Sequence, residues 1–235
     1  MSVAGSVSAA PKKLERMPKD LETRFSLSAL PPHLRDRASV YLLDPAKGYV
    51  LDRKGSNGFS CFVERTEWRF EDDADDVYTA ICYDGEGAAH HMKAWFDVAE
   101  MRAKGVPPSG IAKEMAARYT SGKYPPPARP GLSYMVAPLM RTHPDPSFKD
   151  KAIMTMPMPH VMYYAPEVTN EAIGASPMPG PFPFIFEPGP HGYFIQVLGE
   201  TERGKIVADE RQLLADLCKY RAVLCLSDKP QAHAH

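Results

Sequence analysis

The sequence predicts a single α+β domain of short, mostly antiparallel strands with a helical hairpin, a C-terminal helix and proline-rich loops. Two observations predict this class. Short runs of aromatic and β-branched residues alternate with clusters of turn residues, and helical periodicity is confined to a few segments. No repeat of about 20–50 residues divides the chain, and 44% of its 235 residues are hydrophobic, so a single core is expected.

The domain boundaries follow from changes in composition. We expect residues 1–35 to form a flexible N-terminal arm, because they are polar and charged and show no sustained period. The domain then covers residues 36–227, and the polar residues 228–235 are expected to form a disordered tail. The chain has 24 prolines, about twice the usual frequency, which predicts long and stiff loops.

The first half of the domain is typical of two hairpins. Residues 39–44 and 49–52 are β-type runs around a turn. Residues 59–65 and 78–84 are two further strands, and the first is apolar on both faces. The acidic stretch 71–76 between them predicts a charged loop, because it lacks the glycine and the final glutamate that a calcium-binding loop requires.

Helices and strands alternate less regularly in the second half. A helix is expected over residues 90–104, where an apolar stripe ends before Gly105. A second helix follows Pro107 and Pro108, with Ser109 as a candidate cap, and ends at Gly122, so the two form a helical hairpin. The remaining segments are strands at 132–137, 161–165, 183–187 and 193–199, a helix over 207–221 and a short apolar run at 222–226.

Charge and hydropathy exclude two classes of partner. The formal net charge is -1, so no basic surface is expected to bind nucleic acid. No apolar run approaches the ~18 residues that a transmembrane helix needs, so no transmembrane segment is expected. The first residues, MSVAGSVSAAPKK, contain no basic region followed by an apolar stretch, and we therefore expect no secretory signal there.

One short stretch contains several residue types that bind metals or phosphates. Gly85, Gly87 and His90 follow a predicted strand and superficially match a dinucleotide-binding loop, but His90 stands where a small residue is needed. His90 and His91 diverge by about 100° on a helix, so at most one of them joins a metal site with Cys82, Asp84 or Glu86. We favour the interpretation that this stretch is simply the exposed, polar start of a helix, rather than a metal or phosphate site.

A methionine-rich segment predicts an alternative function. In extended backbone every second side chain points to the same face, and this face then carries Met154, Met156, Met158, His160 and Met162. Thioethers and an imidazole are soft ligands that select Cu(I). The competing interpretation is packing, because methionine fills irregular gaps in a core.

His160 also begins the segment PHVMYYAP, which suggests acid–base chemistry. Histidine is the usual general base near neutral pH, and a tyrosine can donate to a developing oxyanion. Tyr163 and Tyr164 lie on opposite faces of the strand, so one of them is expected beside His160. No nucleophile is evident, because Ser133 lacks the second glycine of a nucleophile elbow. The alternative is that His160 is a hydrogen-bonded structural residue.

The four cysteines contain no paired spacing of a zinc or thioredoxin type. Cys61 and Cys82 lie in the two strands that flank the acidic loop, so they are candidates for a cross-strand disulfide. Cys218 and Cys225 lie at the two sides of a helix end and are expected to be ordinary buried thiols.

Four segments carry a resemblance to a protein family. They are residues 55–65 (GSNGFSCFVER), 82–88 (CYDGEGA), 121–138 (SGKYPPPARPGLSYMVAP) and 159–166 (PHVMYYAP). In this order they resemble an uncharacterised group of bacterial, often exported, proteins that has no assigned activity. The resemblance implies an extracytoplasmic, periplasmic location and favours a Cys61–Cys82 bridge.

Three hypotheses for function follow. The first is a small-molecule-binding domain, hydrolase- or lyase-like, with a pocket in which His160 is the base, Tyr163 or Tyr164 the donor, and Arg65 or Glu86 a charged partner; it predicts no cofactor. The second is an exported protein that binds Cu(I) through the methionine-rich face. The third is a non-catalytic structural or partner-binding domain that presents Phe182, Phe184 and Phe186. Exposed phenylalanines there favour the third hypothesis and buried ones the first. The oligomeric state is not predicted.

Overall fold

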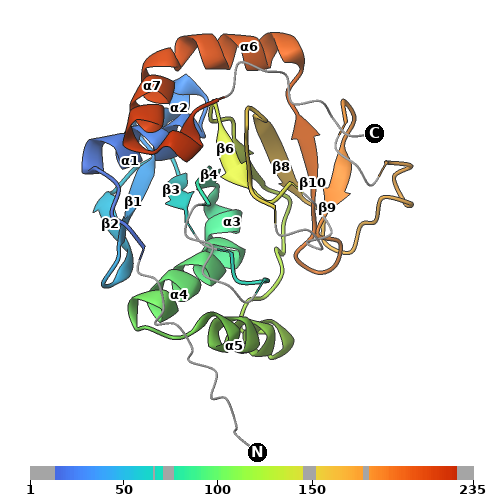
Figure 1. Cartoon of the computed structure of the whole chain (residues 1–235). Coiled ribbons are helices and arrows are strands. Elements are labelled where there is room, and N and C mark those ends of the chain that lie inside the picture. The colour runs from blue at the N-terminus through green and yellow to red at the C-terminus, as the bar shows by residue number, and fades with distance from the viewer. Residues whose placement is uncertain (1–13, 66, 71–76, 145–151, 177–179, 227–235) are drawn as a thin grey trace, which may run out of the picture.

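The computed structural model describes residues 14–65, 67–70, 77–144, 152–176 and 180–226, which form a single compact α+β domain as predicted (Figure 1). An eight-stranded sheet has the order β2-β1-β3-β4-β5-β8-β10-β9. Every pairing in it is antiparallel except β1 with β3. The strands are β1 Ser39–Asp44, β2 Gly48–Arg53, β3 Ser60–Glu64, β4 Thr79–Tyr83, β5 Leu132–Met135, β8 His160–Tyr164, β9 Phe184–Phe186 and β10 Tyr193–Val197.

The remaining elements cover this sheet. Two short strands pair with each other beside β4, and their bounds are β6 Met140–Thr142 and β7 Met154–Met156. The helices are α1 Lys19–Ser28, α2 Pro32–Arg35, α3 Gly85–His90, α4 Met92–Ala103, α5 Pro108–Thr120, α6 Glu200–Asp209 and α7 Arg211–Tyr220, and a 3-10 turn spans Ala222–Leu224. In Figure 1, α1, α2 and α7 lie at the upper left and α4 and α5 at the bottom.

Each face of the sheet has its own core. Helices α1 and α7 pack side by side on one face, where Phe25 and Leu217 belong to the same buried cluster as the cysteines of β3 and β4. An ion pair of 2.9 Å between Arg24 and Asp216 joins the two helices. The other face carries an aromatic and methionine-rich core, in which Phe96 of α4 meets Phe62 with ring centroids 5.3 Å apart. The alternation of side chains along each strand produces this division.

The N-terminal segment differs from the expected flexible arm. Residues 14–35 are part of the folded domain, and α1 contributes side chains to the core. Met17, Leu21 and Phe25 are spaced by four residues, which places them on one face of a helix. They are 1%, 6% and 0% exposed. The prediction failed because this narrow stripe is surrounded by polar and charged residues. Residues 1–13 and the predicted tail 228–235 lie outside the described residues.

The predicted hairpins are confirmed. β1 pairs antiparallel with β2, and β3 pairs antiparallel with β4. The charged loop 71–76 lies outside the described residues. Helices α4 and α5 pack against each other as predicted, and Gly105 and Gly122 follow them with φ angles of +76° and +71°, a backbone conformation that glycine adopts without strain.

Other element boundaries differ from the prediction. Ser109 does not cap α5, because the helix begins at Pro108 after Pro107, and no side chain caps it. Asp84 instead caps a separate short helix, α3, by accepting a hydrogen bond from the Gly87 N–H. The single C-terminal helix expected over 207–221 is two helices, α6 and α7, with a break at Glu210.

The cysteines form two disulfides. Cys61 lies directly opposite Cys82 in the β3–β4 register, and their sulfur atoms are bonded, as predicted. Cys218 and Cys225 are also bonded, so the expectation of ordinary thiols is wrong. The turn from α7 into the 3-10 segment brings the two residues together, with their Cα atoms 4.4 Å apart. Among the described residues, none of the helices has the length and apolar character needed to cross a bilayer.

Removal of the Cys61–Cys82 disulfide should lower the free energy of unfolding by roughly 3 kcal/mol, because the bond restricts the unfolded chain. The comparison is between the wild type and Cys61→Ala/Cys82→Ala in urea. Cys218→Ala/Cys225→Ala is the matched control and should lose less, since its bond spans 7 residues rather than 21. Four titratable thiols in unreduced, denatured protein would contradict both bridges.

A buried carboxyl group in α1 should make stability depend on pH. Glu22 is 1% exposed, its Oε1 accepts a hydrogen bond of 2.8 Å from the Leu43 N–H, and burial raises its pKa to about 7. Between about pH 4.5 and pH 7 the folded chain therefore binds more protons than the unfolded chain, so rising pH costs stability, up to about 3 kcal/mol.

Glu22→Gln keeps an acceptor for Leu43 and removes this titration. Urea unfolding at pH 4.5 and pH 8 should show that the variant gains stability over the wild type only at the higher pH. A difference that is the same at both pH values would mean that Glu22 titrates normally.

Candidate functional site

His160 lies in β8 and is 1% exposed. Its Nδ1 is 2.7 Å from the carbonyl oxygen of Met158, and because a carbonyl can only accept, Nδ1 must carry the proton. Burial lowers its pKa to about 4, so the ring is neutral at pH 7. These surroundings are those of a hydrogen-bonded core residue, and a catalytic role for His160 stays a prediction.

The two tyrosines after His160 lie on opposite faces of β8. Tyr163 is 37% exposed and stacks on Phe194 with ring centroids 5.0 Å apart. Tyr164 is buried on the face that His160 shares, and its hydroxyl donates a hydrogen bond of 3.2 Å to Asp84 Oδ1. Tyr164 is therefore the tyrosine on the same side of the sheet as His160.

Glu86 and Arg65 lie in two other surroundings. Glu86 Oε1 accepts hydrogen bonds from the backbone N–H groups of Ala128 and Arg129, at 2.7 and 3.1 Å, and these bonds lower its pKa. Arg65 is 1% exposed and donates to the Glu15 carbonyl and, over 2.9 Å, to the Tyr78 hydroxyl. Their contacts fix a loop and the N-terminal segment, and neither residue joins His160.

The methionine-rich segment is divided between two sheets. Met154 and Met156 belong to β7, which pairs with β6, whereas His160 and Met162 belong to β8 of the large sheet. Met156 and Met158 pack, together with Met162, against the aromatic core. The described residues contain no group of three or more His, Cys, Asp or Glu side chains arranged to hold a metal ion. A Cu(I) site built on thioethers stays a prediction.

The three phenylalanines of the proline-rich loop have different surroundings. Phe182 is 77% exposed, whereas Phe184 is 2% exposed in the aromatic core. Phe186 is half-buried and stacks on Tyr193 at 5.9 Å. Of the three, only Phe182 is therefore exposed enough to contact another molecule. The hypothesis of a partner-binding loop, which expected three exposed phenylalanines, is correspondingly weaker.

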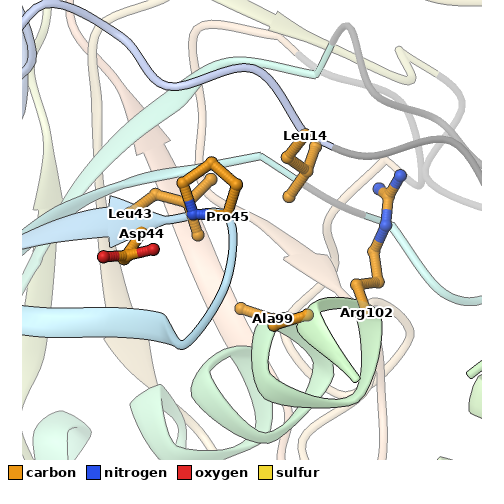
Figure 2. Close-up of a pocket in the computed structure, with 7 residues that line it drawn as sticks. Leu14, Leu43, Asp44, Pro45, Ala99 and Arg102 are labelled. Carbon is orange, nitrogen blue, oxygen red and sulfur yellow. The ribbon is translucent and has the colours of Figure 1, made fainter. Parts of the chain in front are cut away.

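A small cavity lies between α4 and the β1–β2 turn (Figure 2). Its volume is about 10 Å³, which is room for one water molecule at most. Its lining residues include Leu14, Leu43, Asp44, Pro45, Ala99 and Arg102. This cavity is too small for an organic ligand.

A charged cluster lies at the end of β3, on the aromatic side of the sheet. Arg69 Nη1 forms an ion pair of 2.5 Å with Glu67 Oε2, and Arg69 Nη2 forms a second one with the carboxylate of Glu187. The Arg69 and Glu187 side chains are both 26% exposed, so solvent reaches them. Glu67 is held in place because its Oε1 accepts from the backbone N–H groups of Trp68 and Arg69 at 2.8 and 2.9 Å.

Glu64, the last residue of β3, differs from the other two carboxylates. It is half-buried, and no hydrogen bond or ion pair among the described residues engages its carboxyl group. Burial raises its pKa well above the usual range, and the negative charges of Glu67 and Glu187 add to this rise.

Two tyrosines lie on the same face of the sheet as Glu64, Tyr83 at the other end of the β3–β4 pair and Tyr193 on β10. Tyr83 and Tyr193 come from β4 and β10, whose alternation directs them to the same face as Glu64. Burial raises the pKa of both phenols well above 10, and the negative charge of Glu187 acts on each, as it does on Tyr119 of α5. No hydrogen bond among the described residues engages the hydroxyl groups of Tyr119 or Tyr193. The Trp95 indole of α4 is half-buried, and its hydrogen bond to Tyr83 opposes part of the rise in the Tyr83 pKa that burial causes.

Two histidines complete the cluster. The His91 ring is 6.2 Å from that of Tyr193 and 6.0 Å from that of His191, and its Nε2 is buried without a hydrogen-bond partner. Burial lowers the His91 pKa to about 4, so it is neutral at pH 7. The His191 ring lies 5.0 Å from Tyr119, and its Nε2 is 2.8 Å from the Tyr124 carbonyl oxygen.

The backbone of Glu187 is strained. Its φ angle is +54°, a conformation that residues other than glycine adopt at a cost of about 1–3 kcal/mol. Such strain persists where the surroundings or a function require the side chain, and here it brings the carboxylate to Arg69.

Sequence reasoning missed most of this cluster. Glu64 and Tyr83 lie inside two of the segments that carry the family resemblance, and His91 was considered only as a metal ligand. Glu187 and His191 lie in the loop interpreted as partner-binding. The available signal was a glutamate at the end of each of two apolar strands: Glu64 is the last residue of β3, and Glu187 directly follows β9. No family model matches the chain, and no curated protein or solved structure is significantly similar to it.

Acid should destabilise the protein through His160. Because its folded pKa is about 4, the unfolded chain binds more protons as the pH falls below about 6.5, and stability then decreases by up to roughly 3 kcal/mol. His160→Asn keeps a donor for the Met158 carbonyl and removes this titration.

The stability difference between wild type and variant should therefore shrink between pH 7.5 and pH 4.5 in urea unfolding. An equal difference at both pH values would show that His160 is accessible and titrates normally.

Proposed function

We propose that the protein binds a small polar molecule at the site formed by Glu64, Arg69 and Glu187 and exchanges protons with it, as hydrolase- or lyase-like sites do. The observation that carries the proposal is Glu64, a half-buried carboxyl group at the end of β3 with a raised pKa and without a hydrogen-bond or ion-pair partner among the described residues. Perturbed carboxyl groups of this kind gather at sites of acid–base chemistry.

The two glutamates have different surroundings, which suits them to different roles. Burial and the neighbouring negative charges raise the pKa of Glu64, which suits it to the role of proton donor. Burial also raises the pKa of Glu187, but the ion pair with Arg69 opposes this effect, so Glu187 is the carboxylate that accepts a proton from the ligand or from a water molecule. The proton given by Glu64 and the one taken by Glu187 keep the exchange balanced.

Polar groups without hydrogen-bond partners would orient the bound molecule. The Nε2 of His91 is buried without a hydrogen-bond partner among the described residues, and the rings of Tyr193 and His191 lie 6.2 and 6.0 Å from the His91 ring; the hydroxyl groups of Tyr119 and Tyr193 make no hydrogen bond within the described residues. Buried or half-buried polar groups are normally hydrogen-bonded, so a bound molecule is the natural partner for these three. This favours the Glu64 site over a pocket at His160, which is 1% exposed and already hydrogen-bonded.

The two disulfides bear on location. Disulfides persist in oxidising compartments, so the Cys61–Cys82 and Cys218–Cys225 bonds support the extracytoplasmic location that the family resemblance implies. We therefore include that location in the proposal.

Glu187→Asn should abolish ligand binding while changing stability little, because asparagine tolerates a positive φ angle better than glutamate, which offsets the loss of the partly exposed ion pair with Arg69. Ligand-observed NMR against a panel of small cationic, neutral and anionic compounds measures binding, and thermal unfolding measures stability. Glu167→Asn is the matched control: Glu167 has a φ angle of +64° but is exposed and outside the cluster, so binding should persist.

A wild type that binds no member of the panel would contradict the proposed function. So would a Glu187→Asn variant that binds as the wild type does.

A further inference from the structure

We propose that the Cys218–Cys225 disulfide is a thiol-exchange switch: a dithiol reductant opens it in the folded protein, and the opening releases residues 221–226 from the domain. The switch is separate from the proposed function, because none of these residues belongs to the site of Glu64, Arg69 and Glu187. Two features carry the proposal: the access of a reductant to each disulfide, and the contacts that the released residues make.

The two disulfides differ in their access to solvent. Cys61 and Cys82 are both 0% exposed, in the core under α1 and α7. Cys218 lies in the last turn of α7 and Cys225 directly after the 3-10 turn, and both are only half-buried. Because exchange requires a thiolate to reach a sulfur atom, a reductant can attack the second bond in the folded protein but not the first.

Residues 221–226 contact the domain through hydrogen bonds and a buried leucine. Arg221 Nη1 donates a hydrogen bond of 2.8 Å to the Tyr78 hydroxyl, and the Thr155 hydroxyl of β7 donates to the carbonyl oxygen of Val223. Leu224 is 0% exposed and belongs to the core under α1 and α7. These contacts are made by residues that lie between Cys218 and Cys225, so the closed disulfide holds them in place together.

The opening is expected to be local. Leu213 and Leu217 of α7 are 3% and 0% exposed and precede Cys218, so α7 keeps its own contacts with the core when the bond breaks. Without the bond, the hydrogen bonds and the buried Leu224 must by themselves offset the conformational entropy of the ordered segment. We therefore expect residues 221–226 to detach while α1 and α7 remain packed.

The exchange balances with a dithiol as the reductant. One thiolate of the dithiol attacks a sulfur atom of the Cys218–Cys225 bond and forms a mixed disulfide, and the other cysteine leaves as a thiolate that takes up a proton. The second thiol of the reductant then loses its proton and attacks the mixed disulfide, which frees the remaining cysteine and closes a disulfide in the reductant. Two electrons and two protons thus pass from the dithiol to the two cysteines.

Dithiothreitol, a small dithiol, tests the difference in access. The folded wild type is treated with it in the absence of denaturant, samples are alkylated with iodoacetamide at intervals, and each cysteine is followed by peptide mass spectrometry. Cys218 and Cys225 should be alkylated at least about tenfold faster than Cys61 and Cys82, because the buried bond reacts only in chains that have opened more widely. A Cys218–Cys225 bond that is reduced no faster than the Cys61–Cys82 bond would overturn the proposal.

Trypsin measures the release of the segment. In the selectively reduced and alkylated protein, cleavage after Arg221 should be at least about tenfold faster than in the oxidised protein, because Arg221 is freed from Tyr78. Arg118 is the matched control site: it is a partly buried arginine near the end of α5 that pairs with Asp97, and its cleavage rate should not change. Re-oxidation of reduced, unalkylated protein with oxidised glutathione should restore the protection of Arg221.

Cys218→Ser/Cys225→Ser keeps the segment open without a reductant and should show the same fast cleavage after Arg221. The reduction of the wild type tests the proposal even if this variant fails to fold. Protection of Arg221 that survives reduction would overturn the proposal. An equal rise in cleavage after Arg118 would also overturn it, because the opening would then be global unfolding rather than release of the segment.

Discussion

The register between β3 and β4 is the constraint on which the rest of the structure depends. Cys61 lies directly opposite Cys82, and the disulfide between them holds this register covalently. Both cysteines face α1 and α7, so the alternate residues Phe62, Glu64 and Tyr83 face the aromatic core. A slip by one residue would exchange the two faces and would move Glu64 away from the charged cluster.

Buried polar groups fasten the N-terminal segment to the sheet. Under α1 and α7, the Glu22 carboxyl group accepts from the Leu43 N–H, and the Arg65 guanidinium donates to the Glu15 carbonyl and the Tyr78 hydroxyl while its Nε has no partner among the described residues. On the aromatic face, the half-buried Glu64 has no hydrogen-bond or ion-pair partner among the described residues. Satisfied polar groups stabilise a fold, whereas unsatisfied ones at the edge of a core are available to a ligand.

Local patterns predicted much of the fold. Alternating runs located the β1–β2 and β3–β4 hairpins, and flanking glycines located the ends of α4 and α5. The same reasoning missed α1, since Met17, Leu21 and Phe25 form a stripe only one residue wide. It also missed the candidate site, because Arg69 and Glu187 meet through an ion pair between residues far apart in the sequence, which has no local period.

The side-by-side packing of α1 and α7 also governs when the chain can fold. These helices come from opposite ends of the domain, and both are needed to cover the cysteine-bearing face. During synthesis, the apolar stripe of α1 cannot be fully buried until Leu213 and Leu217 of α7 have left the ribosome, because these residues complete the same core. The nascent chain therefore remains open to chaperones throughout its synthesis.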